Sequence, residues 1–282
     1  MRVKAFIELI RPLNSFMTGF AVIVALSIAT RGELFTAIPT QNIVYGFLVG
    51  FFIAASSMVF NDYFDREIDS INVPKRPIPR GDVKAEIALV YAVALGLLGI
   101  LFASLINMYC LLIAVIGLIT SITYSCWGKR LGLLGNMMVS FCVTLPFIFA
   151  QTLLGRVVPV LVVFMLIVFL ANTGREIIKG IADVVGDLAR GVRTVAVVYG
   201  EKTAARVASV FYILAVALTP IPVILGIVNP LYIPLILIVD LGFIISAITI
   251  MRDYRRTIAL REKKRALILM LLGLIAFMIG TL

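Results

Sequence analysis

The chain has 282 residues, of which 62% are hydrophobic and only 14% charged, and its mean hydropathy is +1.11. This composition lies far from that of soluble domains, and the complete lack of histidine excludes imidazole as a general base, haem ligand or zinc ligand. The net charge of +10 does not indicate nucleic-acid binding, because the basic residues lie between long apolar runs rather than on one soluble face.

Apolar runs of about twenty residues recur along the chain, and each is long enough to cross a hydrocarbon core of roughly 30 Å as a helix. Backbone polar groups must be satisfied internally in lipid, so the sequence predicts an all-α, polytopic membrane bundle. We expect nine transmembrane helices, at approximately 13–30, 41–60, 85–106, 108–126, 133–154, 157–178, 204–226, 230–251 and 266–282.

The basic residues support this number of spans. If the spans alternate in direction, all but two of the 25 lysines and arginines fall on one side of the membrane, and the exceptions are Arg31 and Arg156. Positive residues mark the cytoplasmic side. We therefore expect a multi-pass protein of the cell membrane with its N-terminus in the cytoplasm. The basic run 252–265 is interpreted as a determinant of orientation that contacts anionic headgroups of membrane lipids.

Two acidic clusters begin the two longest connections, the predicted cytoplasmic loops 61–84 and 179–203. The first reads Asn-Asp-Tyr-Phe-Asp-Arg-Glu-Ile-Asp over 61–69, and the second reads Asp-Val-Val-Gly-Asp over 183–187. Each follows an apolar run, where ionisable groups are costly and indicate function. Both runs are even-numbered spans, so both clusters emerge on the cytoplasmic side.

The spacing within each cluster predicts a metal site. If the helices of the second and sixth spans continue through these motifs, Asn61, Asp65 and Asp69 lie on one face of the first helix, and Asp183 and Asp187 lie on one face of the second. Carboxylates four residues apart repel each other unless a cation lies between them. Oxygen ligands suit Mg²⁺, which typically completes its coordination with substrate phosphates. We therefore expect both clusters to share Mg²⁺ at one cavity.

Basic residues accompany the acidic clusters. Arginine binds phosphate oxygens with two nitrogens and lysine acts as a point charge, so these residues suit a diphosphate. Metal and cations together would stabilise the charge that develops on a departing diphosphate. The candidates are Arg66, Lys75, Arg76, Arg80, Lys129, Arg175, Lys179 and Arg193.

The paired motifs resemble those of the UbiA superfamily of intramembrane prenyltransferases. Arg11-Pro12-x-Asn14 before the first span, and Tyr124 with Lys129 after the fourth, are also similar to that family's pattern. The resemblance covers essentially all of residues 1–282 and implies one transmembrane prenyltransferase domain. It implies nine helices around a central cavity that opens to the bilayer, and Mg²⁺-dependent transfer of a prenyl group from its diphosphate to a lipophilic acceptor.

The resemblance also implies roles for individual residues. The metal ligands would be Asn61, Asp65, Asp69, Asp183 and Asp187. The catalytic residues would be Asp65, Asp69, Asp183, Asp187, Lys129 and Tyr124. The substrate-binding residues would be Arg11, Asn14, Asn61, Arg66, Lys75, Arg76, Lys179 and Arg193.

Within this superfamily, 61–81, 174–179 and 186–194 are most similar to archaeal digeranylgeranylglyceryl phosphate synthases. Those enzymes add a second geranylgeranyl chain to geranylgeranylglyceryl phosphate to make archaeal ether lipids. One departure is Ala182, where many relatives carry an acid.

Three alternative functions stay open. Residues 65–79 also resemble chlorophyll synthases, which prenylate a tetrapyrrole, and aromatic quinone precursors are a further class of acceptor. The third alternative is a different class of protein, an ion-coupled transporter. Transporters also carry intramembrane acids, usually near the bilayer midplane.

Overall fold

The computed structural model describes residues 3–282, and in this part of the chain the only regular secondary structure is helical, with no strand. The helices are α1 Val3–Leu9, α2 Pro12–Thr30, α3 Leu34–Ala37, α4 Thr40–Phe64, α5 Arg66–Asn72, α6 Ala85–Ser104, α7 Met108–Cys126, α8 Leu133–Leu154, α9 Val160–Ala189, α10 Val195–Tyr199, α11 Glu201–Leu218, α12 Ile221–Ile224, α13 Tyr232–Arg252 and α14 Arg256–Thr281. A 3₁₀ turn, Gly128–Leu131, joins α7 to α8. The all-α fold predicted from the sequence is confirmed.

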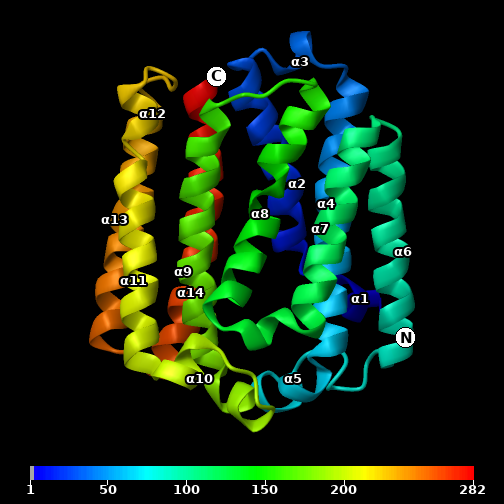
Figure 1. Cartoon of the computed structure of the whole chain (residues 1–282), viewed down its shortest axis with the longest axis vertical. Helices are drawn as coiled ribbons and strands as arrows, with labels where there is room; N and C mark the ends of the chain where they lie inside the picture. Colours follow the sequence, from blue (N-terminus) through cyan, green and yellow to red (C-terminus); the bar gives the residue numbers. More distant parts are fainter. Residues whose placement is uncertain (1–2) are drawn as a thin grey trace.

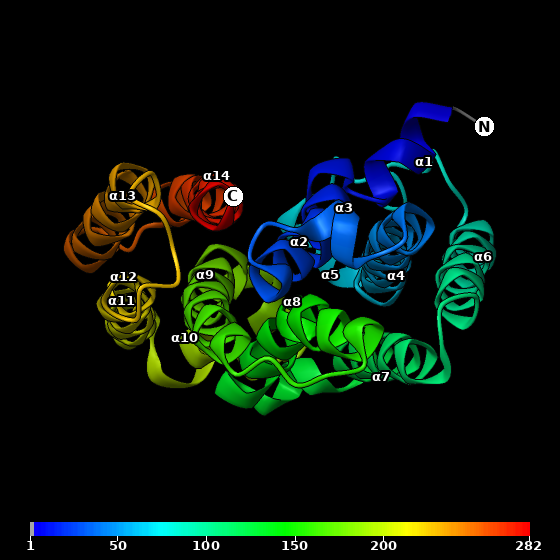
Figure 2. The same ribbon diagram turned by 90° about the horizontal axis from the view of Figure 1, so that it is seen from above.

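Nine helical segments of the described chain are long and apolar enough to cross a membrane: α2, α4, α6, α7, α8, α9, α11 with α12, α13 and α14. They run side by side in Figure 1. Seen from above in Figure 2, they form a ring in which each helix packs against its neighbours. The ring closes where α14, the last helix, packs against α2, the first of the nine. The protein is therefore a multi-pass membrane protein.

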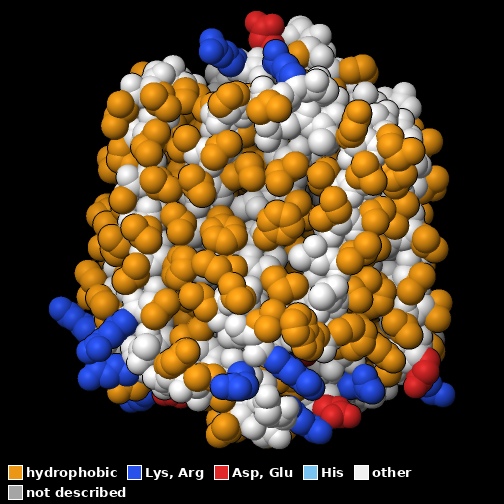
Figure 3. All heavy atoms as spheres, viewed as in Figure 1, with side chains coloured by type: hydrophobic (Ala, Val, Ile, Leu, Met, Phe, Trp, Pro, Cys, Tyr) orange, Lys and Arg blue, Asp and Glu red, His pale blue; other side chains and the backbone are white. Residues whose placement is uncertain are grey.

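The two ends of the bundle differ. The short helices α1, α5 and α10 lie at one end, and α3 and α12 lie at the other (Figure 1). On the face drawn in Figure 3, apolar side chains cover the middle, and lysines and arginines gather at the end with α5 and α10. We call this the basic end. The charge segregation deduced from the sequence therefore corresponds to a real asymmetry of the fold.

Two helices extend further than the sequence predicts. The sixth span was expected to end near residue 178, but α9 continues to Ala189, so the first part of the expected loop 179–203 is helical. The ninth was expected to begin at 266, but α14 begins at Arg256. The physical reason is that the charges there are paired. Glu262 in α14, for example, is fully buried and accepts hydrogen bonds from Arg265 and Ser246.

Small residues allow α2 and α4 to pack closely beside the central cavity. A Cβ atom on Gly50 would lie 2.9 Å from both Gly19 Cα and Thr18 O, closer than real Cβ atoms approach such atoms. Helices in lipid gain little from the hydrophobic effect and depend on close packing of this kind. This contact fixes the spacing of two walls of the cavity.

Replacing Gly50 with Ala therefore should destabilise the bundle by about 1–3 kcal/mol, because α2 and α4 must separate. The measurement is thermal unfolding of the purified protein in detergent. Gly273→Ala is the matched control, since the nearest atom to its added Cβ is 3.9 Å away. Equal unfolding temperatures of the two variants would contradict the importance of this contact.

Candidate functional site

A polar pocket lies at the basic end of the bundle and contains about 570 Å³ of empty space, its opening included. Side chains from α4, α5, α7, α9 and the 3₁₀ turn surround it. The polar or charged residues that line it are Asn61, Asp65, Asp69, Asn72, Arg76, Tyr124, Lys129, Asn136, Glu176, Lys179, Asp183, Asp187 and Thr194. The structure thus brings both acidic motifs to one pocket.

The first motif keeps helical spacing across a helix junction. Asp65 lies between α4 and α5, with φ −87° and ψ 1°. Its backbone N–H donates to Asn61 O at 2.9 Å, and its carbonyl accepts from Asp69 N at 2.7 Å. All three side chains line the pocket and are at most 9% exposed. The expected one-sided arrangement therefore survives the break between the two helices.

Each carboxylate of the first motif contacts a cation. Asp65 pairs with Lys129, and Asp69 pairs with Arg76. No three carboxylates of residues 3–282 lie close enough together to hold a metal ion by themselves. Like charges repel each other, so in this structure the carboxylates are spaced by basic side chains. Metal binding would require exchange of these pairs.

Burial also changes the proton affinities of the pocket. Burial raises the pKa of Asp69 to about 6, although Arg76 acts in the opposite direction. Burial lowers the pKa of the Lys129 amine, and Asp65 partly offsets this effect. Both shifts follow from the cost of placing charge away from water.

The second motif carries an unsatisfied acceptor. Asp183 Oδ1 is buried and accepts no hydrogen bond, and its nearest cation is Lys263, at 3.8 Å. A buried acceptor without a partner is destabilising unless a ligand satisfies it. The atoms that could coordinate a metal here are carboxylate and amide oxygens, the ligand set that Mg²⁺ prefers. The residues present therefore fit a magnesium ion.

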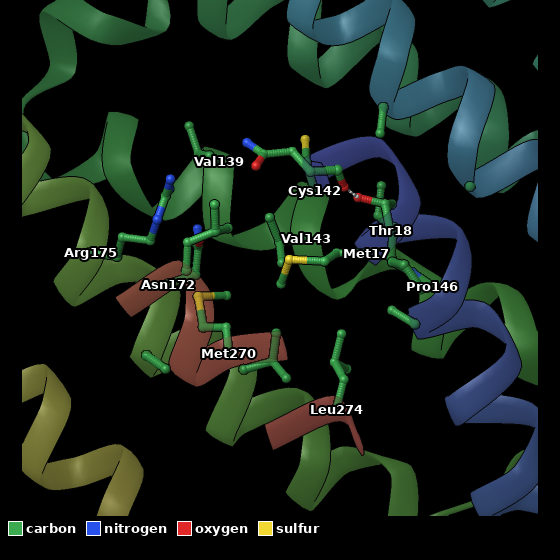
Figure 4. Close-up of a pocket in the computed structure, with 18 of the residues that line it drawn as sticks. Met17, Thr18, Val139, Cys142, Val143, Pro146, Asn172, Arg175, Met270 and Leu274 are labelled. Carbon is green, nitrogen blue, oxygen red and sulfur yellow. Dashed lines mark hydrogen bonds between the residues drawn. The ribbon is translucent and has the colours of Figure 1, made fainter. Parts of the chain in front are cut away.

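A second, larger cavity extends from the polar pocket into the apolar interior. It contains about 1910 Å³ of empty space including its openings, and most of its wall is apolar. In Figure 4, Met17, Val143, Met270 and Leu274 face into it. Asn61, Tyr124, Glu176 and Lys179 line both cavities and so mark the boundary between them. A molecule with a charged head and a long apolar tail would fit across this boundary.

The other predicted site residues divide into two groups. Arg11 and Asn14 line the large cavity only, and Arg76 lines the polar pocket only. Arg66, Lys75 and Arg193 line neither cavity. Arg66 lies over the Tyr63 ring, 5.0 Å from its centroid, and Lys75 and Arg193 are exposed. Contacts of these three with a ligand stay predictions.

The sequence reasoning assigned no role to two buried acids. Asp62 accepts hydrogen bonds from Arg11 and from Arg76, the latter at 3.1 Å. Glu176 accepts from Arg175 at 2.7 Å and Lys179 at 3.0 Å. Glu176 could have been found from its spacing, because Lys179 follows it at i+3 on a helix, directly after a long apolar run.

Asn72 joins the two motifs directly. Its side chain donates to Asp183 O at 2.9 Å and accepts from Gly186 N at 3.0 Å, so α5 is docked against α9. Arg256 of α14 strengthens this contact between α5 and α9, because its guanidinium donates to Asn72 O at 2.7 Å and to Ala182 O at 3.1 Å. We call these four hydrogen bonds the Asn72 clasp. It holds the second motif next to the first.

The assignment of the whole basic run 252–265 to lipid headgroups is therefore wrong for two residues. Arg256 belongs to the Asn72 clasp, and Lys263 is the nearest cation to Asp183. These contacts could not be foreseen from the hydropathy, because α14 was expected to begin ten residues later, at 266. Since α14 begins at Arg256, its first two turns bring these side chains next to the second motif.

The clasp predicts coupling between Asn72 and Gly186. An added Cβ at Gly186 would lie 2.6 Å from Asn72 Cγ, so Gly186→Ala should lower the unfolding temperature. In an Asn72→Ala background the clash is absent, and Gly186→Ala should then be less damaging. Gly180→Ala is the control in the same helix, since its added Cβ would be 3.7 Å from the nearest atom. Additive effects of the two substitutions on thermal unfolding would contradict the clasp.

Comparison with known proteins agrees with this geometry. Residues 18–275 match the UbiA prenyltransferase family. The digeranylgeranylglyceryl phosphate synthases of Methanopyrus kandleri and Thermococcus kodakarensis are each 36% identical to this chain; the alignments cover 99% and 100% of the chain and 100% and 99% of the relatives.

Solved structures share the fold. One, described as "Structural and mechanistic insights into the biosynthesis of Digeranylgeranylglyceryl phosphate synthase in membranes", is 33% identical, with a TM-score of 0.74 over 99% of this chain and 98% of that one. A UbiA homolog from Archaeoglobus fulgidus bound to DMAPP and Mg²⁺ is 18% identical, with a TM-score of 0.70 over 96% of this chain and 98% of that one. The chain therefore belongs to the UbiA prenyltransferase family.

Proposed function

We propose that this protein transfers a geranylgeranyl group from geranylgeranyl diphosphate to geranylgeranylglyceryl phosphate. The product would be digeranylgeranylglyceryl phosphate, a precursor of archaeal ether lipids. The observation that carries this proposal is that both aspartate motifs line one polar pocket, which opens into a large apolar cavity. The relatives that match over the full chain support the choice of donor and acceptor.

The acidic motifs would hold Mg²⁺ together with the donor diphosphate. We assign Asn61, Asp65, Asp69, Asp183 and Asp187 as its ligands, because their oxygens surround the pocket and Asp183 Oδ1 has no hydrogen-bond partner. The ion would supply Lewis-acid stabilisation of the negative charge on the leaving diphosphate. Its use is supported by the related structure that contains DMAPP and Mg²⁺.

The chain's own residues would orient the donor at the boundary between the two cavities. Lys129 and Lys179 face the polar pocket and would bind diphosphate oxygens. Tyr124 lines both cavities, so its ring lies where the first carbon of the prenyl chain would be held. Side chains of the large cavity would enclose the tail and exclude water, which would otherwise capture the allylic cation.

The reaction itself makes modest demands on acid–base groups. The allylic C–O bond breaks and both of its electrons leave with the diphosphate. The acceptor hydroxyl oxygen then bonds to the prenyl carbon, and its proton passes to oxygens of the polar pocket. No strong base is needed once the cation has formed, which agrees with a chain that has no histidine.

We further propose that the basic end faces the cytoplasm, with the N-terminus and the active site on that side. The support is the concentration of lysines and arginines there (Figure 3). Residues 1–282 would then act as one catalytic domain, with reacting groups carried by 61–84 and 179–203. Chain-length selection would depend on the apolar walls of the large cavity.

Asp65→Ala and Asp183→Ala should each reduce Mg²⁺-dependent transfer by about a hundredfold or more, because each removes an oxygen ligand. The measurement uses purified protein, Mg²⁺ and radiolabelled geranylgeranyl diphosphate. Asp253→Ala is the control, because Asp253 pairs only with the neighbouring Arg255 and lines neither cavity. Thermal unfolding checks that each variant is folded, and full turnover in either variant would refute the metal assignment.

The same assay separates the rival functions. Product with geranylgeranylglyceryl phosphate supports the proposal, whereas product only with a hydroxybenzoate or a chlorophyllide would replace it by the quinone or tetrapyrrole alternative. Uptake of a labelled solute into vesicles without pyrophosphate release would indicate a transporter instead.

The raised pKa of Asp69 predicts that the Mg²⁺ concentration needed for activity increases at low pH. Below pH 6 this carboxyl is protonated in the metal-free protein, so Mg²⁺ must displace a proton to bind. Between pH 6 and pH 5 the Mg²⁺ concentration for half-maximal rate should rise by up to about tenfold. The measurement is the Mg²⁺ dependence of the rate at each pH. A constant requirement from pH 5 to pH 7 would exclude Asp69 as a ligand.

A further inference from the structure

The cations around the two cavities fall into separate sets. Lys129 and Arg76 line only the polar pocket, together with the four aspartates of the motifs. Arg11 and Arg175 line only the large cavity, and Lys179 lines both. The proposed diphosphate site therefore does not include Arg175. Its position requires a different explanation.

Arg175 is buried in the wall of the large cavity with an unused hydrogen-bond donor. Its side chain is 16% exposed and donates from Nη1 to Glu176 at 2.7 Å, but its Nε is buried and donates to nothing. Glu176 already accepts from Lys179, so neutralising Glu176 does not by itself require Arg175. In Figure 4, Arg175 and Asn172 lie on the α9 side of the cavity, across from Met17 and Thr18 of α2.

Arg11, the residue directly before α2, also lines this cavity, and its guanidinium donates a hydrogen bond to Asp62. Its backbone has φ 45° and ψ 72°, a left-handed conformation that is uncommon for a residue with a side chain. Such strain persists only where the surrounding structure imposes it, and it is concentrated at functional sites. Pro12 follows at the first turn of α2, so the helix begins directly after this residue.

We infer that Arg175, assisted by Arg11, binds the phosphate of a phosphorylated lipid acceptor, at a second anion site distinct from the diphosphate site. This inference rests on the proposed function. Arg175 is one helical turn, about 6 Å along the axis, from the boundary residue Lys179, and two turns, about 12 Å, from Asp183. A glyceryl phosphate has its phosphate only a few bonds from the reacting hydroxyl, so one end could lie on Arg175 while the hydroxyl reaches the boundary.

The chemistry of arginine suits this role. A guanidinium binds two phosphate oxygens at once, which fixes the orientation of the acceptor as well as its position. Separate sites also keep the two anionic headgroups apart, with Glu176 and Lys179 between them. The selectivity of the protein for a phosphorylated acceptor would therefore reside mainly in Arg175.

The test compares geranylgeranylglyceryl phosphate with the same ether alcohol lacking the phosphate, using the full chain, Mg²⁺ and geranylgeranyl diphosphate. Arg175→Gln should raise KM for the phosphorylated acceptor by about tenfold or more. Its kcat/KM for the unphosphorylated alcohol and its KM for the donor should stay within about twofold of wild type. Arg206→Gln is the control: it removes the same charge from an exposed position at the basic end, outside both cavities, and should change none of these constants.

Arg175→Lys keeps the positive charge but removes the guanidinium group that binds two phosphate oxygens at once. This variant serves as the test if Arg175→Gln does not fold. It should raise KM for the phosphorylated acceptor by a smaller factor and leave the alcohol unaffected. Equal losses on both acceptors, a raised donor KM or unchanged constants would each overturn the assignment of Arg175. Wild-type protein that prenylates neither glyceryl acceptor would refute the proposed function, which is a separate result.

Discussion

The pairing of buried charges at the basic end of the bundle is the interaction on which the rest of the structure depends. An isolated carboxylate next to lipid is very costly, so acids persist there only with cations close by. Asp65 has Lys129, Asp69 has Arg76, and Glu176 has Arg175 and Lys179. The pair of Asp65 and Lys129 joins the end of α4 to the 3₁₀ turn, and the pair of Asp69 and Arg76 ties α5 to the loop that follows it, so these pairs also fix how the helix ends meet.

The same pairing gives the pocket a means of responding to its ligand. If Lys129 binds the donor diphosphate as proposed, it would exchange Asp65 for a phosphate oxygen and need not pass through an unpaired state. Asp183 is compensated less closely, since its nearest cation, Lys263, is 3.8 Å away and its buried oxygen accepts no hydrogen bond. The site therefore combines carboxylates that are already compensated with one that is poised for a further ligand.

Much of this arrangement could be predicted from the sequence, because it follows from two strong signals. Apolar runs and the segregation of lysine and arginine gave the spans, and acids at helical spacing gave the motifs that share the pocket. The ends of α9 and α14 could not be found in this way, because hydropathy stops at the first charged residues, whereas a helix continues wherever those charges find partners. The Asn72 clasp was also beyond reach, since it joins residues separated by 114 and 184 positions.

The closing contact between α14 and α2 has a consequence for the order of assembly. Ser27 and Thr281 are hydrogen-bonded at 3.1 Å, so the last residues of the final helix are anchored on the first membrane helix. The opposite end of that helix places Arg256 and Lys263 beside the second aspartate motif. During synthesis the eight earlier spans would therefore enter the membrane with the second aspartate motif still lacking these neighbours. The second motif gains these neighbours only when α14 has entered the membrane and the ring has closed.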